Sequence, residues 1–271
     1  MGLPCFSAYF GSWTFYGLFA LGFDHLLLLI ASRRWLLYCD AHIHLLPDLD
    51  NGPCAASEAL FMLRSMQDNG CRHAVLTPHF YHDRETISSF LSRRKTALAS
   101  LLSLAEPISR FLFALSAEVH ISPGVSRLSQ LERLLIPHTR FLPIELPLGR
   151  LDDFAIRELS HMIHKRNIQP IICQTERHFL LYTSADYEKL VSLPHALYAF
   201  SAPALLNRDV VTEIVRLVTS DHRVLVGSNA HNMQDRRPID RDLEDEISRH
   251  SATVYKMLCL QTAAYLKPAF S

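Results

Sequence analysis

Residues 35–44 read Trp-Leu-Leu-Tyr-Cys-Asp-Ala-His-Ile-His, an apolar run that ends in two histidines separated by one residue. Alternate side chains of a β-strand point to the same face, so this run predicts a strand over 36–44 that directs His42 and His44 toward one point. Imidazole is a good ligand for several transition metals. The pair therefore indicates a metal site, although two histidines in a loop or on a solvated strand would give the same short pattern.

Beyond this stretch, apolar strand-like runs alternate with amphipathic helical segments. Strands are predicted over 36–44, 73–77, 111–119, 141–146, 169–173, 196–201 and 223–226. Helices are predicted from an N-cap at Ser57 to a stop at Gly70, and over 84–104, 209–220, 240–249 and 253–260. Such alternation within one chain predicts an α/β fold with a parallel sheet, most simply a barrel.

Polar residues that can bind metals recur where the predicted strands end. They are His42, His44, His79, Glu118, Glu145 and His231. The carboxyl ends of the strands in a parallel barrel meet at one face, and that face holds the chemistry. The sequence thus predicts that four histidines and two carboxylates surround a single opening. His120, two residues after Glu118, could face the same opening.

The composition narrows the function further. The chain has 271 residues, 27 basic and 27 acidic side chains, 15 histidines and six cysteines. Balanced charge gives no indication of nucleic-acid binding. The cysteines are scattered without a C-x-x-C pair, which favours buried, reduced thiols over a disulfide framework. None lies in the C-x5-R pattern of thiol phosphatases.

The N-terminal segment differs from the rest of the chain, and we divide the sequence into an apolar extension, 1–35, and a domain, 36–271. Between Phe6 and Ile30 only Asp24 and His25 are strongly polar, and two arginines follow at 33 and 34. The length suits a membrane-spanning helix, and the arginines would then place the domain on the cytoplasmic side. A membrane anchor, an apolar helix packed on the domain, and an upstream start outside the working protein all remain open.

From about Leu37 to its end, the sequence resembles the PHP (polymerase and histidinol phosphatase) superfamily. More closely, it is similar to the bacterial manganese-dependent protein-tyrosine phosphatases of capsule and exopolysaccharide operons. The motifs that carry the resemblance are His42-Ile43-His44-Leu45-Leu46-Pro47 with Asp50-Asn51-Gly52, Thr77-Pro78-His79, Ala117-Glu118-Val119, Ile144-Glu145-Leu146-Pro147, Thr175-Glu176-Arg177 and Ser228-Asn229-Ala230-His231-Asn232.

The resemblance implies a distorted (β/α)7 barrel that holds up to three divalent metals, often manganese. The residues that match family ligands are His42, His44, His79, Glu118, Glu145 and His231. Arg177 and Arg236, or its neighbour Arg237, match the basic residues that hold the substrate phosphate, with Arg177 and Arg236 expected to be catalytic. Clustered metals polarise a phosphoryl oxygen and activate water, and arginine binds phosphate in a bidentate fork. The implied partner is a phosphotyrosine protein such as a bacterial tyrosine kinase tail.

Three positions depart from the family pattern, because each replaces a strong ligand with an amide. Asn51 stands where the family usually has Asp, Gln174 where it has His, and Asn229 where it has Asp. An amide oxygen brings no negative charge to offset the repulsion between neighbouring cations. We therefore expect fewer metals than in relatives, one or two, and reduced turnover. Two alternatives remain open: a pseudo-phosphatase that binds phosphotyrosine or a partner without turnover, and another PHP phosphatase such as one for histidinol phosphate.

Overall fold

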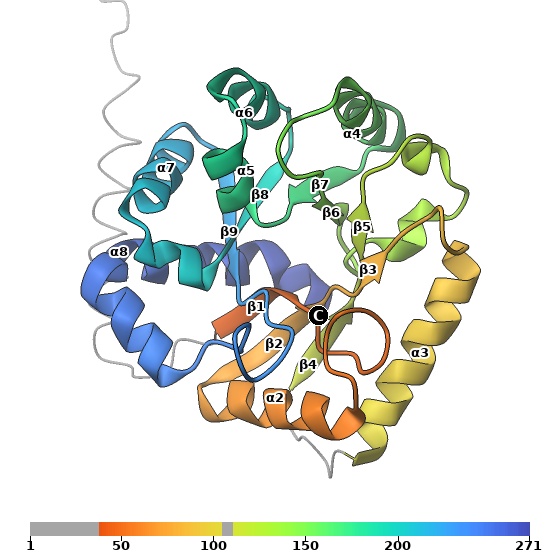
Figure 1. The fold of residues 1–271 in the computed structure, drawn as a ribbon, viewed down its shortest axis with the longest axis vertical. Helices are drawn as coiled ribbons and strands as arrows, with labels where there is room; N and C mark the ends of the chain where they lie inside the picture. Colours follow the sequence, from red (N-terminus) through yellow and green to blue (C-terminus); the bar gives the residue numbers. More distant parts are fainter. Residues whose placement is uncertain (1–37, 105–110) are drawn as a thin grey trace, which may run out of the picture. The chain divides into compact units, whose positions relative to one another are not determined.

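The computed structural model describes residues 38–104 and 111–271, so the predicted extension at 1–35 lies outside the described residues. Strands and helices alternate along the described chain, and Figure 1 shows the helices around the outside of the strands. The strands are β1 (Tyr38–Ile43), β2 (Cys71–Leu76), β3 (His79–Phe80), β4 (Leu112–Leu115), β5 (Glu118–His120), β6 (Phe141–Glu145), β7 (Gln169–Ile172), β8 (Leu197–Ser201) and β9 (Arg223–Gly227). The helices are α2 (Ala56–Asp68), α3 (Ile87–Leu104), α4 (Asp153–Arg166), α5 (Thr175–Leu181), α6 (Ser184–Val191), α7 (Arg208–Thr219) and α8 (Arg241–Leu266), with short 3-10 turns η1 (Val125–Arg127), η2 (Leu131–Leu134), η3 (Ala202–Leu206) and η4 (Lys267–Phe270).

The described strands form two parallel sheets, which confirms the predicted α/β class. One sheet has the order β1-β2-β4, and the other has the order β3-β5-β6-β7-β8-β9. An isolated parallel bridge between Ile43 and Ala230 joins the end of β1 to the segment after β9. Parallel pairing brings the carboxyl ends of neighbouring strands to the same edge, where the predicted ligands lie.

The prediction of a single strand over 111–119 was wrong, because this segment is divided between the two sheets. β4 pairs with β2, whereas β5 pairs with β3. The neighbouring segment is divided at Thr77-Pro78, and Pro78 has no N–H to donate to a ladder. Thr77 instead donates its backbone N–H to the carbonyl of Ile43 over 3.0 Å, and Glu118 donates to the carbonyl of Pro78 over 3.0 Å. The chain thus passes from one sheet to the other just before His79, and again just before Glu118.

The start of α2 also differs from the prediction. The helix begins at Ala56 with Ala55 in the N-cap position, so Ser57 lies inside the first turn rather than at the cap. The Glu58 carboxylate accepts the backbone N–H of Cys54 over 3.1 Å, which satisfies a donor just before the helix without a serine cap.

Buried apolar side chains form the core of the described domain. Ala59, Met62, Leu63 and Met66 are buried on one face of α2, as their helical spacing predicts. A second cluster includes residues of β1, β2 and β4 together with residues of β7, β8 and β9, so it connects the two sheets. Of the cysteines in the described residues, Cys54 is exposed, which contradicts the predicted burial, and the other four are buried as free thiols.

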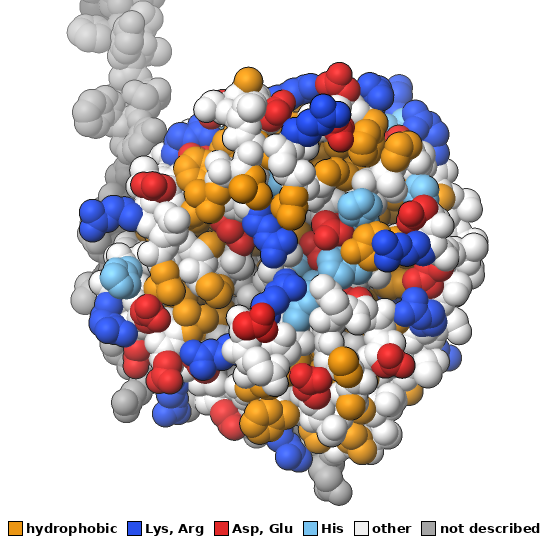
Figure 2. All heavy atoms as spheres, in the orientation of Figure 1, with side chains coloured by type: hydrophobic (Ala, Val, Ile, Leu, Met, Phe, Trp, Pro, Cys, Tyr) orange, Lys and Arg blue, Asp and Glu red, His pale blue; other side chains and the backbone are white. Residues whose placement is uncertain are grey.

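The site lies on the face of the molecule shown in Figure 2. Histidine and acidic side chains gather near the middle of this face, and basic side chains lie beside them. They occupy the region over the strand ends seen in Figure 1, with helices arranged around it.

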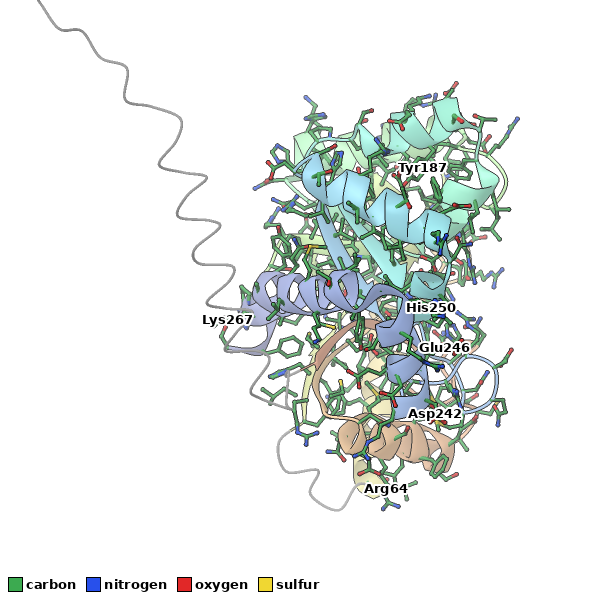
Figure 3. All side chains as sticks on the ribbon, turned by 90° about the vertical axis from the view of Figure 1, so that its left-hand side faces the viewer. Arg64, Tyr187, Asp242, Glu246, His250 and Lys267 are labelled. Atoms are coloured by element: carbon green, nitrogen blue, oxygen red, sulfur yellow. The ribbon has the colours of Figure 1, made fainter. Side chains whose placement is uncertain are left out.

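The predicted helices over 240–249 and 253–260 correspond to the two parts of α8, which meet at a kink where Ser251 leaves the helical conformation, with φ of −150° and ψ of 35°. Asp240 caps the helix by accepting the backbone N–H of Leu243. Asp242, Glu246 and His250, labelled in Figure 3, are spaced four residues apart along its exposed side. Among the residues that the structure describes, no helix is long and apolar enough to cross a membrane.

Candidate metal centre

Glu118 is the centre of the candidate site. Its side chain is completely buried, and its Oε2 atom lies 3.5 Å from His42 Nε2, 3.2 Å from His44 Nε2 and 3.3 Å from His79 Nδ1. Burial alone would raise the pKa of Glu118, but the three imidazoles hold it well below its usual range. Glu118 is therefore a carboxylate, and three imidazole nitrogens from two separate sequence motifs converge on one of its oxygens.

His44 is held in place by Asp50. The Nδ1–H of His44 donates to Asp50 Oδ2 over 2.7 Å, and the same oxygen accepts the backbone N–H of His79 over 2.9 Å. Burial would lower the pKa of His44, but Asp50 and Glu118 outweigh it and raise the pKa to about 9. A carboxylate that binds one ring nitrogen of a metal-ligating histidine fixes the orientation of the other nitrogen. Asp50 therefore directs His44 Nε2 toward Glu118.

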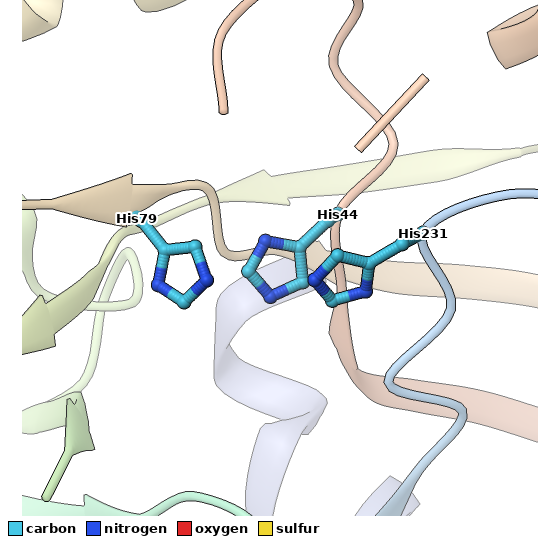
Figure 4. A group of neighbouring side chains, drawn as sticks. All are labelled: His44, His79 and His231. Carbon is cyan, nitrogen blue, oxygen red and sulfur yellow. The ribbon is translucent and has the colours of Figure 1, made fainter. Parts of the chain in front are cut away.

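His231 completes a group of three neighbouring imidazoles, which Figure 4 shows. Its ring lies 3.8 Å from that of His44 at an interplanar angle of 28°, and the His79 ring lies 4.6 Å from His44 on the other side. The Nδ1–H of His231 donates to the carbonyl of Asn229 over 3.0 Å, so Nε2 carries the lone pair. Burial, with the charges of His44 and Arg236, lowers the pKa of His231 to about 2, and a neutral imidazole is the form that binds metals.

The donor set fits a divalent cation. Buried atoms that lack a hydrogen-bond partner among the described residues include His79 Nδ1, His231 Nε2 and Glu118 Oε1. Two groups have ligand atoms that all lie within 4.8 Å of one another: His44, His79 and His231, and His42, His44 and Glu118. Buried polar atoms without partners are unfavourable, and a cation that they share would satisfy them. His42 Nε2 and His44 Nε2 also lie 3.2 Å apart and share a hydrogen bond.

Glu145 lies at the edge of this group. Its Oε2 atom is 3.6 Å from His79 Nδ1 and 3.0 Å from His120 Nδ1. Burial raises the pKa of Glu145, but the hydrogen bond from His120 and the charge of His79 outweigh it and lower the pKa. All six residues that the sequence predicts as ligands thus lie in one connected group.

Two of the three amide positions lie together on another side of the site. Asn229 Oδ1 accepts a hydrogen bond from Arg236 Nη2 over 2.9 Å and one from Gln174 Nε2 over 3.4 Å. Both amide residues adopt left-handed backbone conformations two residues after a strand ends, with φ of 51° at Gln174 after β7 and 53° at Asn229 after β9. The third, Asn51, is exposed. Asn229 Oδ1 therefore already accepts hydrogen bonds from two protein side chains.

The predicted phosphate-binding arginines have different surroundings. Arg236 is half-buried beside Asn229, and Arg177 is exposed in the first turn of α5. Burial and the charge of Arg177 lower the pKa of Arg236, so the two guanidinium groups repel each other. Arg237 instead pairs with Asp240, with Nη1 3.0 Å from Oδ2. The structure thus brings Arg236 to the site and directs Arg237 to the start of α8.

Asp50 lies within the Asp50-Asn51-Gly52 motif, and the sequence alone indicates no role for it. The same is true of Asp40, whose Oδ1 accepts the backbone N–H groups of His42 and Ser228 over 3.1 and 2.8 Å. These bonds fix the end of β1 against the end of β9. The signal for Asp50 was the Asp-Asn-Gly sequence, a turn pattern that returns the chain to the strand end. Gly52 in this turn lies so close to His44 that an added Cβ would be 2.8 Å from the His44 carbonyl oxygen.

The fold and the buried donor set define a mixed α/β protein with a candidate metal centre at its strand ends. The family described as capsular polysaccharide synthesis, CpsB/CapC, matches residues 38–265, and the chain belongs to this family. It is 25% identical over 202 residues to CapC of Staphylococcus aureus, assigned as a tyrosine-protein phosphatase, and 22% identical over 213 residues to the tyrosine-protein phosphatase YwqE of Bacillus subtilis. Each comparison covers 73% of this chain and 78% of the relative.

A solved structure has the same fold. It comes from work on YwqE of Bacillus subtilis and CpsB of Streptococcus pneumoniae, which are described as metal-dependent tyrosine phosphatases. The TM-score is 0.63 at 18% sequence identity, and the superposition covers 85% of this chain and 94% of the other. Family membership and fold therefore agree with the resemblance found in the sequence.

Proposed function

We propose that this protein is a metal-dependent phosphatase that hydrolyses phosphotyrosine in proteins and regulates capsular or exopolysaccharide synthesis. The observation that carries the proposal is the convergence of His42, His44 and His79 on one buried oxygen of Glu118. Membership of the CpsB/CapC family supports the substrate class, because the relatives CapC and YwqE are named as tyrosine-protein phosphatases.

The proposed cofactor is a divalent metal, with manganese as the expected ion. His42, His44 and Glu118 would hold it, with His79, His231 and Glu145 at the adjoining positions. When bound, such a cation withdraws charge from phosphoryl oxygens and lowers the pKa of water. The contact of His44 with Asp50, and the contacts of the imidazole rings with one another, hold these ligand side chains in place.

Arg236 and Arg177 are proposed to bind the phosphate. Burial and repulsion from Arg177 lower the pKa of Arg236, and a phosphate dianion between the two guanidinium groups would relieve the repulsion. Each guanidinium presents a planar fork of N–H donors that matches phosphate oxygens. Arg236 is already oriented by Asn229, so it can donate its remaining N–H groups to the substrate.

We propose that the chain holds one or two metals rather than three. Gln174 and Asn229 bring no charge, and the Asn229 oxygen already accepts two hydrogen bonds from protein donors. Asn51 is exposed and is likewise an amide. Fewer carboxylates leave more repulsion between neighbouring cations, which weakens the binding of an additional ion.

We further propose a protein substrate, a cellular location and a closed barrel for this domain. The substrate would be a phosphotyrosine protein such as the tail of a bacterial tyrosine kinase, with no role for nucleic acid. The domain would be cytoplasmic. An anchor in residues 6–30, one of the three alternatives that the sequence leaves open for this segment, would hold it at the inner face of the membrane. We also propose that the strands close into a distorted seven-stranded barrel, which the bridge between Ile43 and Ala230 supports.

The test of this function compares three substrates: a phosphotyrosine peptide, a phosphoserine peptide and histidinol phosphate. We expect hydrolysis of the phosphotyrosine peptide in the presence of manganese and little of the other two. Arg236→Gln should lower kcat/KM about 10- to 100-fold, because a hydrogen bond to a charged group contributes roughly 1.5–3 kcal/mol.

Arg64→Gln is the matched control, because Arg64 is exposed on α2 (Figure 3), and it should leave hydrolysis unchanged. Faster hydrolysis of histidinol phosphate than of the phosphotyrosine peptide would contradict the proposed substrate class. Equal activity of Arg236→Gln and the wild type would remove Arg236 from phosphate binding.

A further inference from the structure

The loop after β3 holds the Arg84 side chain against the ring of Tyr81. The carbonyl oxygen of Tyr81 accepts the backbone N–H groups of Arg84 over 3.1 Å and of Glu85 over 3.2 Å, which closes a turn. The Arg84 Cζ atom lies 4.4 Å from the centre of the Tyr81 ring, a distance at which a guanidinium is attracted to the face of an aromatic ring. The turn and the ring together therefore give the Arg84 guanidinium a defined position.

Tyr81 in turn packs against the candidate metal centre. Its ring centroid lies 5.6 Å from that of His79 and 5.2 Å from that of His120, which contacts Glu145. Tyr81 is half-buried, whereas Arg84 is exposed. Arg84 is thus separated from the ligand His79 by a single aromatic ring, and it lies at the edge of the site that faces solvent.

The Arg84 guanidinium is available to a ligand, because none of the described acidic side chains forms an ion pair with it. Glu85, its neighbour in the chain, pairs instead with Arg93, whose Nη1 lies 2.7 Å from Glu85 Oε1. Arg84 follows β3, whereas Arg177 and Arg236 follow β7 and β9. Figure 2 shows basic side chains on more than one side of the histidine and acidic group. Arg84 therefore adds a positive charge apart from the proposed phosphate-binding arginines.

We propose that Arg84 binds an acidic residue that flanks the phosphotyrosine of a protein substrate. The inference rests on the proposed function, because a peptide whose phosphate is bound by Arg236 and Arg177 would pass along the edge of the site where Arg84 lies. A guanidinium can bind a carboxylate through two parallel hydrogen bonds, and stacking on Tyr81 leaves its N–H edge free for this contact. The preferred substrate thus carries Asp or Glu beside the phosphotyrosine.

Two peptides of equal length test this preference, one with Glu on both sides of the central residue and one with Gln. The central residue is phosphonomethylphenylalanine, which resists hydrolysis, and dissociation constants for the full chain in manganese chloride are measured by fluorescence anisotropy. We expect the wild type to bind the Glu peptide about two- to fivefold more tightly, as for an exposed ion pair, and added salt to reduce this ratio. In Arg84→Gln the ratio should fall to about one.

Arg64→Gln is the matched control, because it removes an exposed positive charge from α2 and should keep the wild-type ratio. Arg84→Lys retains the charge without the planar fork and should keep part of the ratio. Equal thermal midpoints of the variants and the wild type establish that each protein is folded.

Equal binding of the two peptides by the wild type overturns the inference, as does an Arg84→Gln variant that keeps the wild-type ratio. An equal loss of affinity for both peptides in Arg84→Gln would place Arg84 on the phosphate and would also overturn it. Hydrolysis of the corresponding phosphotyrosine peptides is measured separately. A chain that prefers the Glu peptide through Arg84, yet hydrolyses neither phosphotyrosine peptide, would retain the acidic-residue site and lose the proposed function.

Discussion

His44→Ala should abolish phosphotyrosine hydrolysis and remove most of the bound manganese. His44 Nε2 lies 3.2 Å from both His42 Nε2 and Glu118 Oε2, so it takes part in the closest contacts of the candidate centre. The variant also leaves the carboxylates of Asp50 and Glu118 buried without their shared imidazole. A bound metal contributes several kcal/mol to stabilising the transition state, and a loss of about 4 kcal/mol lowers kcat/KM about 10³-fold.

The measurement pairs kcat/KM for a phosphotyrosine peptide with the manganese content of the same sample. His164→Ala serves as the control, because it removes an exposed imidazole from α4. A thermal midpoint for each metal-free protein separates loss of metal from loss of fold. Wild-type metal content in His44→Ala would contradict the assignment of His44 as a ligand.

The triple variant Asn51→Asp, Gln174→His and Asn229→Asp should bind one more manganese ion than the wild type and hydrolyse substrate at least about tenfold faster. The changes add two carboxylates and one imidazole. They must be made together, because Asn229 Oδ1 accepts hydrogen bonds from both Gln174 and Arg236. Asn229→Asp alone would place a carboxylate against the Arg236 guanidinium and pair with it.

The size of the gain distinguishes the two interpretations of the amides. A wild type with measurable turnover and a moderate gain is an active phosphatase with a reduced metal set. A wild type near zero with a large gain is a pseudo-phosphatase. Asn69→Asp, at the end of α2, adds a charge away from the site and is the control. No increase in the metal content of the triple variant would show that the amides do not limit metal binding.

The sequence predicted the parts of the site that depend on local periodicity. His42 and His44 share a strand face because they are two residues apart, and both reach Glu118. Glu145 and His231 could be predicted as neighbours of this pair because they lie at the ends of later strands, and parallel strands present their carboxyl ends together. The buried face of α2 followed in the same way from helical spacing.

The parts that depend on contacts between distant segments could not be predicted. The division of the segment 111–119 arises from hydrogen bonds to Leu76 and Pro78, which the sequence does not reveal. The choice between Arg236 and Arg237 depends on Asp240, which pairs with the second. The contact of His120 with Glu145 depends on the register between β5 and β6, and a shift of one residue would separate them.

We propose above all that hydrolysis depends on a metal held by this histidine and glutamate group. It is tested most directly by following release of phosphate from a phosphotyrosine peptide by the full chain before and after removal of metal. We expect that chelation abolishes hydrolysis, that added manganese restores it, and that the restored protein contains one or two ions per chain. Hydrolysis that survives complete removal of metal, or full activity of His44→Ala without bound metal, would contradict it.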